Sequence, residues 1–106
     1  MATITRTDYT RASREASRLN SAILRRSYLL QQTRSPRFAE TLREEIDRDT
    51  AAFTEAILRF VRKVQAQGPP NVRARLEAII ATKCIGGDTL AIAWQFARLP
   101  DTARAA

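Results

Sequence analysis

Apolar side chains recur along most of the chain at intervals of three and four residues, the spacing of an amphipathic helix. The longest such series comprises Phe38, Leu42, Ile46, Thr50, Phe53, Ile57, Phe60, Val61 and Val64, with Thr50 as its one polar member. It predicts a helix over residues 36–67 with a continuous buried face. That helix would be about 47 Å long, whereas a compact domain of this size spans about 34 Å, so we expect it to bend near residues 47–50 or one of its ends to project toward a partner.

Another helix is predicted before it, over residues 8–32. Thr7 or Asp8 is suited to cap its first turn, because a short polar side chain can accept a hydrogen bond from a free backbone N–H. Ser35 and Pro36 form the start of the central helix, since proline at the first helical position loses only an N–H that has no partner there. The short connection between the two helices favours antiparallel packing.

Two shorter helices are predicted after the central one. Residues 68–70 (Gly-Pro-Pro) end the central helix, and Asn71 is placed to cap a third helix over residues 72–84. The glycine pair at residues 86–87 ends the third helix. A fourth helix then covers residues 88–99, with its first aspartate as the cap.

These elements predict an all-α fold, a small four-helix bundle-like domain with one long central helix. It would be a single domain over residues 1–106, with residues 1–7 and 101–106 as flexible ends. Cys84, which has Ile80 and Ile85 nearby, is expected to lie inside. The expected core consists of Leu19, Ile23, Leu42, Ile46, Phe53, Ile57, Leu76, Ile79, Ile80 and Trp94.

The chain carries a net charge of +7, from 16 arginines and two lysines against 11 carboxylates, and it has no histidine. The basic excess is concentrated at one end. Residues 1–34 hold seven arginines against Asp8 and Glu15, a net charge of +5, whereas residues 35–66 hold six basic and six acidic side chains. An excess distributed in this way is typical of a surface that binds a polyanion.

Four of these arginines fall on one face of the first helix, at spacings of three, four and seven residues. At about 100° per residue this stripe is centred roughly 140° from the apolar stripe of the same helix, so it should face solvent. Guanidinium groups form charge-assisted, bidentate bonds to phosphate, which predicts contact with the backbone of RNA or single-stranded DNA without sequence specificity. The candidate nucleic-acid-binding residues are Arg11, Arg14, Arg18 and Arg25 of the stripe, Arg26 beside it, and Arg73 and Arg75 of the third helix. The alternative is that Glu15 and the acids of the central helix neutralise the stripe as surface ion pairs.

Enzymatic activity is not indicated. The absence of histidine removes the commonest general acid–base group and the commonest metal ligand. Cys84 accordingly has no histidine to activate it. Glu40, Glu44 and Asp47 share one helical face, but pairing with neighbouring arginines accounts for them without a metal. We therefore expect no catalytic residue, no metal, no cofactor and no small-molecule substrate.

The fourth helix is apolar around most of its circumference. Ile92, Trp94, Phe96 and Leu99 cannot all face one small core from so short a helix, so we expect it to contact another protein subunit or a second copy of the chain. The few polar side chains left on this helix argue against a base-reading recognition helix.

The location expected from the sequence is cytoplasmic. The single cysteine cannot form an internal disulfide, which is typical of a reducing compartment. No stretch approaches the length of an apolar membrane span, and the N-terminal region lacks the hydrophobic segment of a signal peptide. We therefore expect no association with a membrane.

Residues 57–80 (ILRFVRKVQAQGPPNVRARLEAII) combine an amphipathic helix, a glycine-containing break and an Arg-x-Arg-Leu helix start. In this run, which covers under a quarter of the chain, and in its small, basic, all-helical character, the protein resembles the small subunit of CRISPR effector complexes. The resemblance implies a helical bundle inside a multi-subunit ribonucleoprotein complex of antiviral defence, with no catalytic residue. The implied backbone-contacting positions are Arg11, Arg14, Arg18, Arg25, Arg73 and Arg75.

Two functions are therefore compatible with the sequence. The first is a non-catalytic subunit that binds nucleic-acid backbone within a multi-subunit nucleoprotein complex. The second is a helical protein-binding module, such as a phage- or plasmid-encoded inhibitor or adaptor, whose basic face meets an acidic protein surface. Salt-dependent binding to RNA or DNA of arbitrary sequence would distinguish them.

Overall fold

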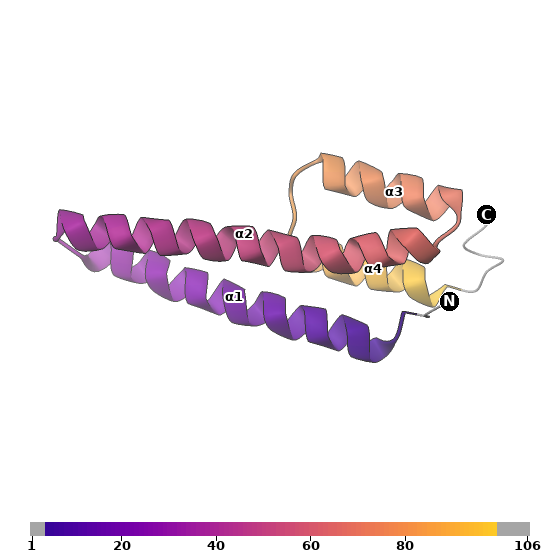
Figure 1. Cartoon of the computed structure of the whole chain (residues 1–106), viewed down its shortest axis with the longest axis horizontal. Coiled ribbons are helices and arrows are strands. Elements are labelled where there is room, and N and C mark those ends of the chain that lie inside the picture. Colours follow the sequence, from indigo (N-terminus) through magenta and orange to yellow (C-terminus); the bar gives the residue numbers. More distant parts are fainter. Residues whose placement is uncertain (1–3, 100–106) are drawn as a thin grey trace.

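The computed structural model describes residues 4–99, which form four helices: α1 (Arg6–Gln32), α2 (Pro36–Gln67), α3 (Pro70–Ala81) and α4 (Gly87–Arg98). α1 and α2 pair as a long antiparallel hairpin, and the two short helices lie beside one end of it (Figure 1). All regular secondary structure in this part of the chain is helical, which confirms the all-α, bundle-like prediction.

The central helix has the bounds that the sequence predicts. Ser35 is its N-cap, with a side-chain oxygen that accepts a hydrogen bond from the backbone N–H of Phe38 (3.3 Å), and Pro36 is its first residue. α2 then continues unbroken to Gln67. Residues 47–50, where a bend was one of the two expectations, are part of this continuous helix. Instead the closed end of the hairpin extends well past α3 and α4, in a molecule that measures 58 × 26 × 18 Å (Figure 1).

α1 begins earlier than the predicted residue 8. Its N-cap is Thr5, whose hydroxyl accepts a hydrogen bond from the backbone N–H of Asp8 (3.2 Å), while the Asp8 carboxylate accepts one from the backbone N–H of Thr5 (2.9 Å). This capping box satisfies two backbone donors at once. The prediction of a flexible arm is therefore wrong for residues 4–7. Residues 1–3 and 101–106 lie outside the described residues.

The start of α3 also differs from the prediction. Its N-cap is Pro69 and its first residue is Pro70, so Asn71 lies within the first turn and is not the cap. Proline at the first position fits the helix because its fixed φ is already helical. The turn before α3 is tight. A Cβ atom on Gly68 would lie 2.9 Å from Cγ1 of Val72, so a larger residue there would disturb the core.

α3 ends at Ala81, short of the predicted residue 84, because the backbone turns away. Lys83 adopts a left-handed φ of 61°, which a helix does not accommodate. The following Cys84 lies exposed in the connection to α4, so the prediction that it is part of the core is wrong. Gly86 is the N-cap of α4, and its backbone N–H donates to the hydroxyl of Thr89 (3.1 Å); the predicted capping aspartate lies inside the first turn.

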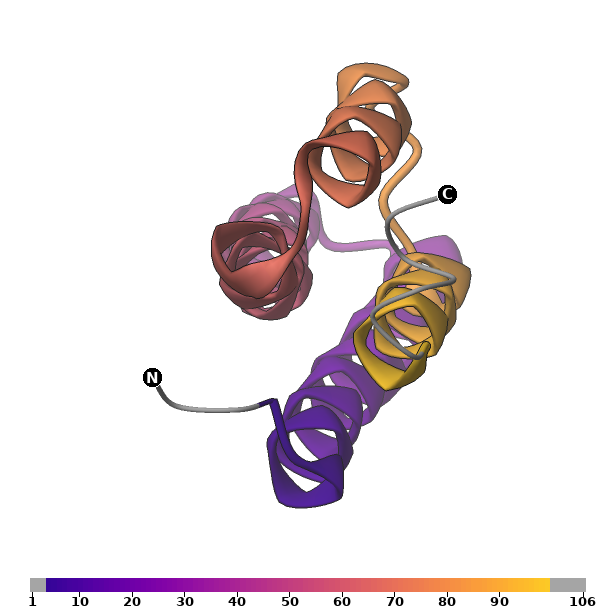
Figure 2. The same cartoon turned by 90° about the vertical axis from the view of Figure 1, so that its right-hand side faces the viewer.

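The core is located where α3 and α4 meet the open end of the hairpin. Its members come from all four helices: Ala16, Ile57, Phe60, Val61, Val64, Val72, Leu76, Leu90 and Ala93. Each buried valine, leucine, isoleucine or phenylalanine side chain of this set contributes about 1.5–3 kcal/mol to folding. α3 packs against α2 and α4 on the side away from α1 (Figure 2). Arg62 and Gln65 of α2 hold α3 in place by donating hydrogen bonds to the carboxylate of Glu77 on α3 (2.7 and 3.1 Å).

The predicted core is confirmed in part. Leu19, Leu42, Ile57 and Leu76 are buried, whereas Ile23, Ile46, Phe53, Ile79, Ile80 and Trp94 are half-buried. Phe53, Ile79, Ile80 and Trp94 pack against the buried core from its edge. Ile23 and Ile46 lie toward the closed end of the hairpin, which has only two helices. Two helices cover each other's apolar stripes incompletely, so part of each stripe stays in contact with solvent.

Candidate nucleic-acid interface

The predicted arginine stripe lies on the outer face of α1. Arg11, Arg14, Arg18 and Arg25 are all exposed, because the opposite side of α1, with Ala16 and Leu19, is buried against the other helices. The four residues span about 21 Å of helix. None of them forms an ion pair with any carboxylate of the described residues.

Several cations of α2 are paired, in contrast to the stripe. The pairs, each with a nitrogen–oxygen distance of 4.0 Å or less, are Arg48–Asp49 (3.5 Å), Arg59–Glu55 (3.5 Å), Arg62–Glu77 (2.7 Å) and Lys63–Asp8 (3.7 Å). Glu15 is half-buried along the groove between α1 and α2 and makes no such contact with the stripe. The acids therefore do not neutralise the stripe as ion pairs, which was the alternative explanation of the pattern.

Asp8, a carboxylate near the start of the stripe, leaves the stripe positive. The hydrogen bonds that this carboxylate accepts from the backbone N–H and hydroxyl of Thr5 lower the pKa of Asp8, and the nearby charges of Lys63 and Arg11 lower it further. Asp8 is thus ionised at neutral pH, but it is engaged by the cap and by Lys63. Arg14 and Arg18, further along α1, have no acidic partner within 4 Å in the described residues.

Arg26 has a different role from its neighbour Arg25. Its side chain is half-buried between α1 and α2, where Nε lies 2.7 Å from Oε2 of Glu45 and Nη1 pairs with the carboxylate of Asp49. Asp49 is only 8% exposed. We therefore assign Arg26 to the hairpin interface and remove it from the candidate nucleic-acid-binding residues. Its position next to an exposed arginine in the sequence did not reveal this, because the partners are on another helix.

Arg6 is exposed and lies beside the first arginines of the stripe, so it joins the candidate residues. Arg6, Arg11 and Arg14 border a shallow depression on α1 together with the hydroxyl-bearing residues Thr7 and Thr10. The lining contains only hydrogen-bond donors or neutral hydroxyls at its side-chain tips, which suits an anion. Arg6 is not among the residues expected from the sequence, because residues 1–7 are assigned there to a flexible arm. The Thr-x-x-Asp spacing of the capping box is the sequence signal that identifies the true start of the helix.

Arg73 and Arg75 do not extend the stripe. Both are exposed, but they lie on α3, which is on the far side of the molecule from α1 (Figure 2). Nε of Arg73 also donates a hydrogen bond to the carbonyl oxygen of Gly68 (3.0 Å) at the end of α2. One continuous surface therefore cannot include these two residues and the stripe.

The predicted protein-binding residues of α4 divide into two groups. Trp94 and Phe96 pack against the core, and the Trp94 ring stacks on Tyr9 of α1 with centroids 5.3 Å apart and an interplanar angle of 7°. Ile92 is half-buried, and Leu99 is 39% exposed. Trp94 and Phe96 therefore take part in packing within this chain. Ile92 and Leu99 remain accessible.

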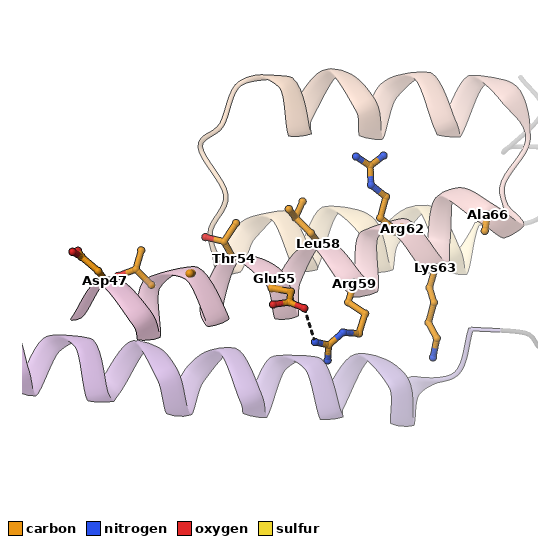
Figure 3. Close-up of a pocket in the computed structure, with 10 residues that line it drawn as sticks. Asp47, Thr54, Glu55, Leu58, Arg59, Arg62, Lys63 and Ala66 are labelled. Atoms are coloured by element: carbon orange, nitrogen blue, oxygen red, sulfur yellow. Dashed lines mark hydrogen bonds and ion pairs between the residues drawn. The ribbon is translucent and has the colours of Figure 1, made fainter. Parts of the chain in front are cut away.

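A depression of about 1000 Å³ on α2 is open to solvent (Figure 3). Its lining residues come from this single helix and point in different directions: Leu58 and Arg62 point toward α3, whereas Lys63 points toward α1.

Across residues 4–99, no group of three or more acidic or cysteine side chains is placed to hold a metal ion. Arg48 pairs with Asp49 and not with the acidic face of Glu40, Glu44 and Asp47, so the pairing proposed for that face is not present.

Comparison of the chain with models of protein families, with curated proteins and with solved structures finds no match. No helix in the described part of the chain is long and apolar enough to cross a membrane.

Proposed function

We propose that this protein binds the phosphate backbone of nucleic acid through the outer face of α1, without sequence specificity and without catalysis. The observation that carries the proposal is the exposure of Arg11, Arg14, Arg18 and Arg25 with no carboxylate of the described residues within ion-pair distance. Unpaired guanidinium groups retain their full attraction for phosphate, since no internal contact has to be broken first.

The composition of α1 strengthens the electrostatic argument. From Ala16 to Gln32 this helix contains no acidic residue, and Arg18 and Arg25 stay unpaired there among the described residues, while Arg26 is paired with Glu45 and Asp49. An anion approaching its outer face therefore meets only positive charge over most of the helix. Release of counterions from the nucleic acid then provides much of the binding free energy.

Backbone contact is favoured over reading of bases. A side chain that reads a base edge is normally held in one orientation by neighbouring groups, because bidentate bonds require a fixed geometry. Apart from the attraction between Arg11 and Asp8, the stripe arginines have no partner in residues 4–99 that would hold their side chains in this way. Contacts to phosphate tolerate such freedom, since the phosphate group accepts bonds from several directions.

The proposal includes assembly with other subunits in a nucleoprotein complex, as the resemblance to CRISPR small subunits implies. Its support is the accessible apolar surface at the end of the chain described, where Ile92 of α4 is half-buried and Leu99, the residue that caps α4, is 39% exposed. Apolar side chains left accessible in this way are suited to a protein contact.

The test is a pair of double charge reversals with the same change in net charge. Arg14→Glu with Arg18→Glu alters the stripe, while Arg37→Glu with Arg43→Glu alters two exposed arginines of α2 that also have no ion pair in the described residues. Binding to labelled strands of arbitrary sequence is measured by fluorescence anisotropy from about 50 to 200 mM salt.

We expect the stripe reversal to weaken binding at least tenfold at about 50 mM salt and to reduce the slope of log affinity against log salt by about 1.4 for a single strand. The α2 reversal should cause a much smaller loss, and both variants should melt within a few degrees of the parent, because exposed charges contribute little to stability. Equal binding by the stripe reversal and the parent would refute the proposal. Capture of an acidic protein after nuclease treatment, lost in the stripe reversal, would then support the protein-adaptor function.

A further inference from the structure

The last two turns of α1 present an exposed surface of unusual composition. Leu24 is 61% exposed and Tyr28 is 64% exposed, and Leu29 is also exposed. Arg25 lies among them at helical spacings of one, three and four residues, and neighbours at three and four residues are in contact range on a helix surface. This surface, which we call the tyrosine patch, consists of Leu24, Arg25, Tyr28 and Leu29.

The tyrosine patch continues the arginine stripe. Tyr28 follows Arg25 by three residues, so it lies about 60° around the helix and about 4.5 Å further along it. The closed end of the hairpin projects away from α3 and α4, so neither helix covers the patch (Figure 1). A strand that follows the stripe would reach this aromatic ring next.

Tyr28 is available in a way that the other tyrosine is not. Tyr9 is enclosed by the fold, with its ring stacked on Trp94 and in tilted contact with Phe60 (5.8 Å between centroids). Tyr28 forms no ring contact within residues 4–99. Most of the surface of Tyr28 is therefore open to a partner.

We propose that Tyr28 stacks on an unpaired base and that the protein consequently prefers single-stranded nucleic acid to duplex. This inference rests on the proposed function, because the arginine stripe must first hold the strand. Arg25 would bind a phosphate beside the stacked nucleotide, and Leu24 would extend the apolar platform. The faces of paired bases are covered by their neighbours in a duplex, whereas a single strand can turn a base onto a ring.

A symmetric contact with a second copy fits the tyrosine patch less well. Such a contact places the same residues of both copies against each other, so Arg25 would approach Arg25. The nearest stretch of helix cannot compensate, since residues 16–32 contain no acidic side chain. The charge of the patch is complementary to a nucleotide strand.

The experiment compares Tyr28→Ala and Tyr28→Phe in the full chain, with Phe38→Ala as the matched control. Phe38 is also an exposed aromatic residue at the closed end of the hairpin, 46% exposed, but it lies on α2. Each protein is titrated into labelled oligo-dT, a duplex, and an abasic strand with the same number of phosphates. Sedimentation velocity records the oligomeric state, and circular dichroism records the helix content and melting temperature.

We expect Tyr28→Ala to lose at least about fivefold in affinity for oligo-dT, the lower limit for one stacked base, with its salt slope and its duplex affinity unchanged. Tyr28→Phe and Phe38→Ala should bind oligo-dT like the parent, and the parent should bind the abasic strand as weakly as Tyr28→Ala binds oligo-dT.

Equal affinity of Tyr28→Ala and the parent for oligo-dT overturns the inference while the proposed function stands. A parent dimer that dissociates in Tyr28→Ala also overturns it, since the patch is then a protein contact. If the parent binds neither strand nor duplex at low salt, the proposed function fails as well.

Discussion

Replacing Arg26 with methionine should destabilise the hairpin, whereas the same replacement of the adjacent Arg25 should not. Methionine keeps an apolar stem of similar length, so the change mainly removes the charge. In the parent, Arg26 pairs with Glu45 and with the nearly buried Asp49. Without Arg26, the Asp49 carboxylate retains only Arg48, 3.5 Å away, whose side chain is largely exposed.

The expected cost follows from the burial of this cluster. Breaking a fully buried ion pair costs about 3–5 kcal/mol, and breaking a surface pair costs about 0–1 kcal/mol. The side chain of Asp49 is 11% exposed and that of Arg26 is 28% exposed, so the pair lies between these limits. We therefore expect a loss of about 2 kcal/mol, which lowers the melting temperature of a domain this size by roughly 8 °C.

The assay is thermal and urea unfolding followed by circular dichroism. The variants are Arg26→Met, Arg25→Met, Asp49→Asn and the double variant Arg26→Met with Asp49→Asn. The double variant should recover most of the loss, because no uncompensated charge remains buried, and the coupling between the two sites should be about 1–2 kcal/mol. If Arg26→Met unfolds at the same temperature and urea concentration as Arg25→Met, the assignment of Arg26 to the hairpin interface is incorrect.

Three further predictions concern the packing and the pH dependence of the fold. Ile57→Ala should cost about 2–5 kcal/mol in urea unfolding because Ile57 is fully buried, and the half-buried Phe53→Ala should cost distinctly less; a larger loss for Phe53 would contradict the position of the core. Gly68→Ala should lower stability by about 1–3 kcal/mol because its Cβ would enter the core, whereas Gly87→Ala, with open space at the start of α4, should be neutral or stabilising in the same melts. Hydrogen bonds from Gln65 and Arg62 lower the pKa of Glu77 below its ordinary 4.5, so this stabilisation is present above pH about 4.5 and is lost as the pH falls through the folded-state pKa. Glu77→Gln should therefore show a smaller fall in melting temperature than the parent on acidification below pH about 4.5, and equal falls would refute this.

Local pattern was sufficient for much of the fold. The bounds of α2 follow from Ser35-Pro36 at one end and the Gly-Pro-Pro break at the other, which act on backbone groups within the same turn. The outward position of Arg11, Arg14 and Arg18 follows from the helical period and the apolar stripe of the same helix. The start of α1 also follows from local pattern, because the Thr5-x-x-Asp8 spacing is that of a capping box.

Other features depended on which helices meet. The sequence places Arg25 and Arg26 side by side, but only the packing of α2 against α1 brings Glu45 and Asp49 to the second of them. Likewise, only the packing of α3 on the far side of α2 and α4 separates its arginines from the stripe (Figure 2).

By itself, the sequence determined four helices, their amphipathic faces and a cationic outer face on α1, because each depends on residues within about one turn of one another. The tertiary structure decided which apolar side chains form the core and which arginines form ion pairs. It also decided that the closed end of the hairpin projects, with Tyr28 exposed. These features depend on contacts between residues far apart in the chain. A repeating pattern along one helix shows which face is apolar, but it does not specify which other helix will cover that face.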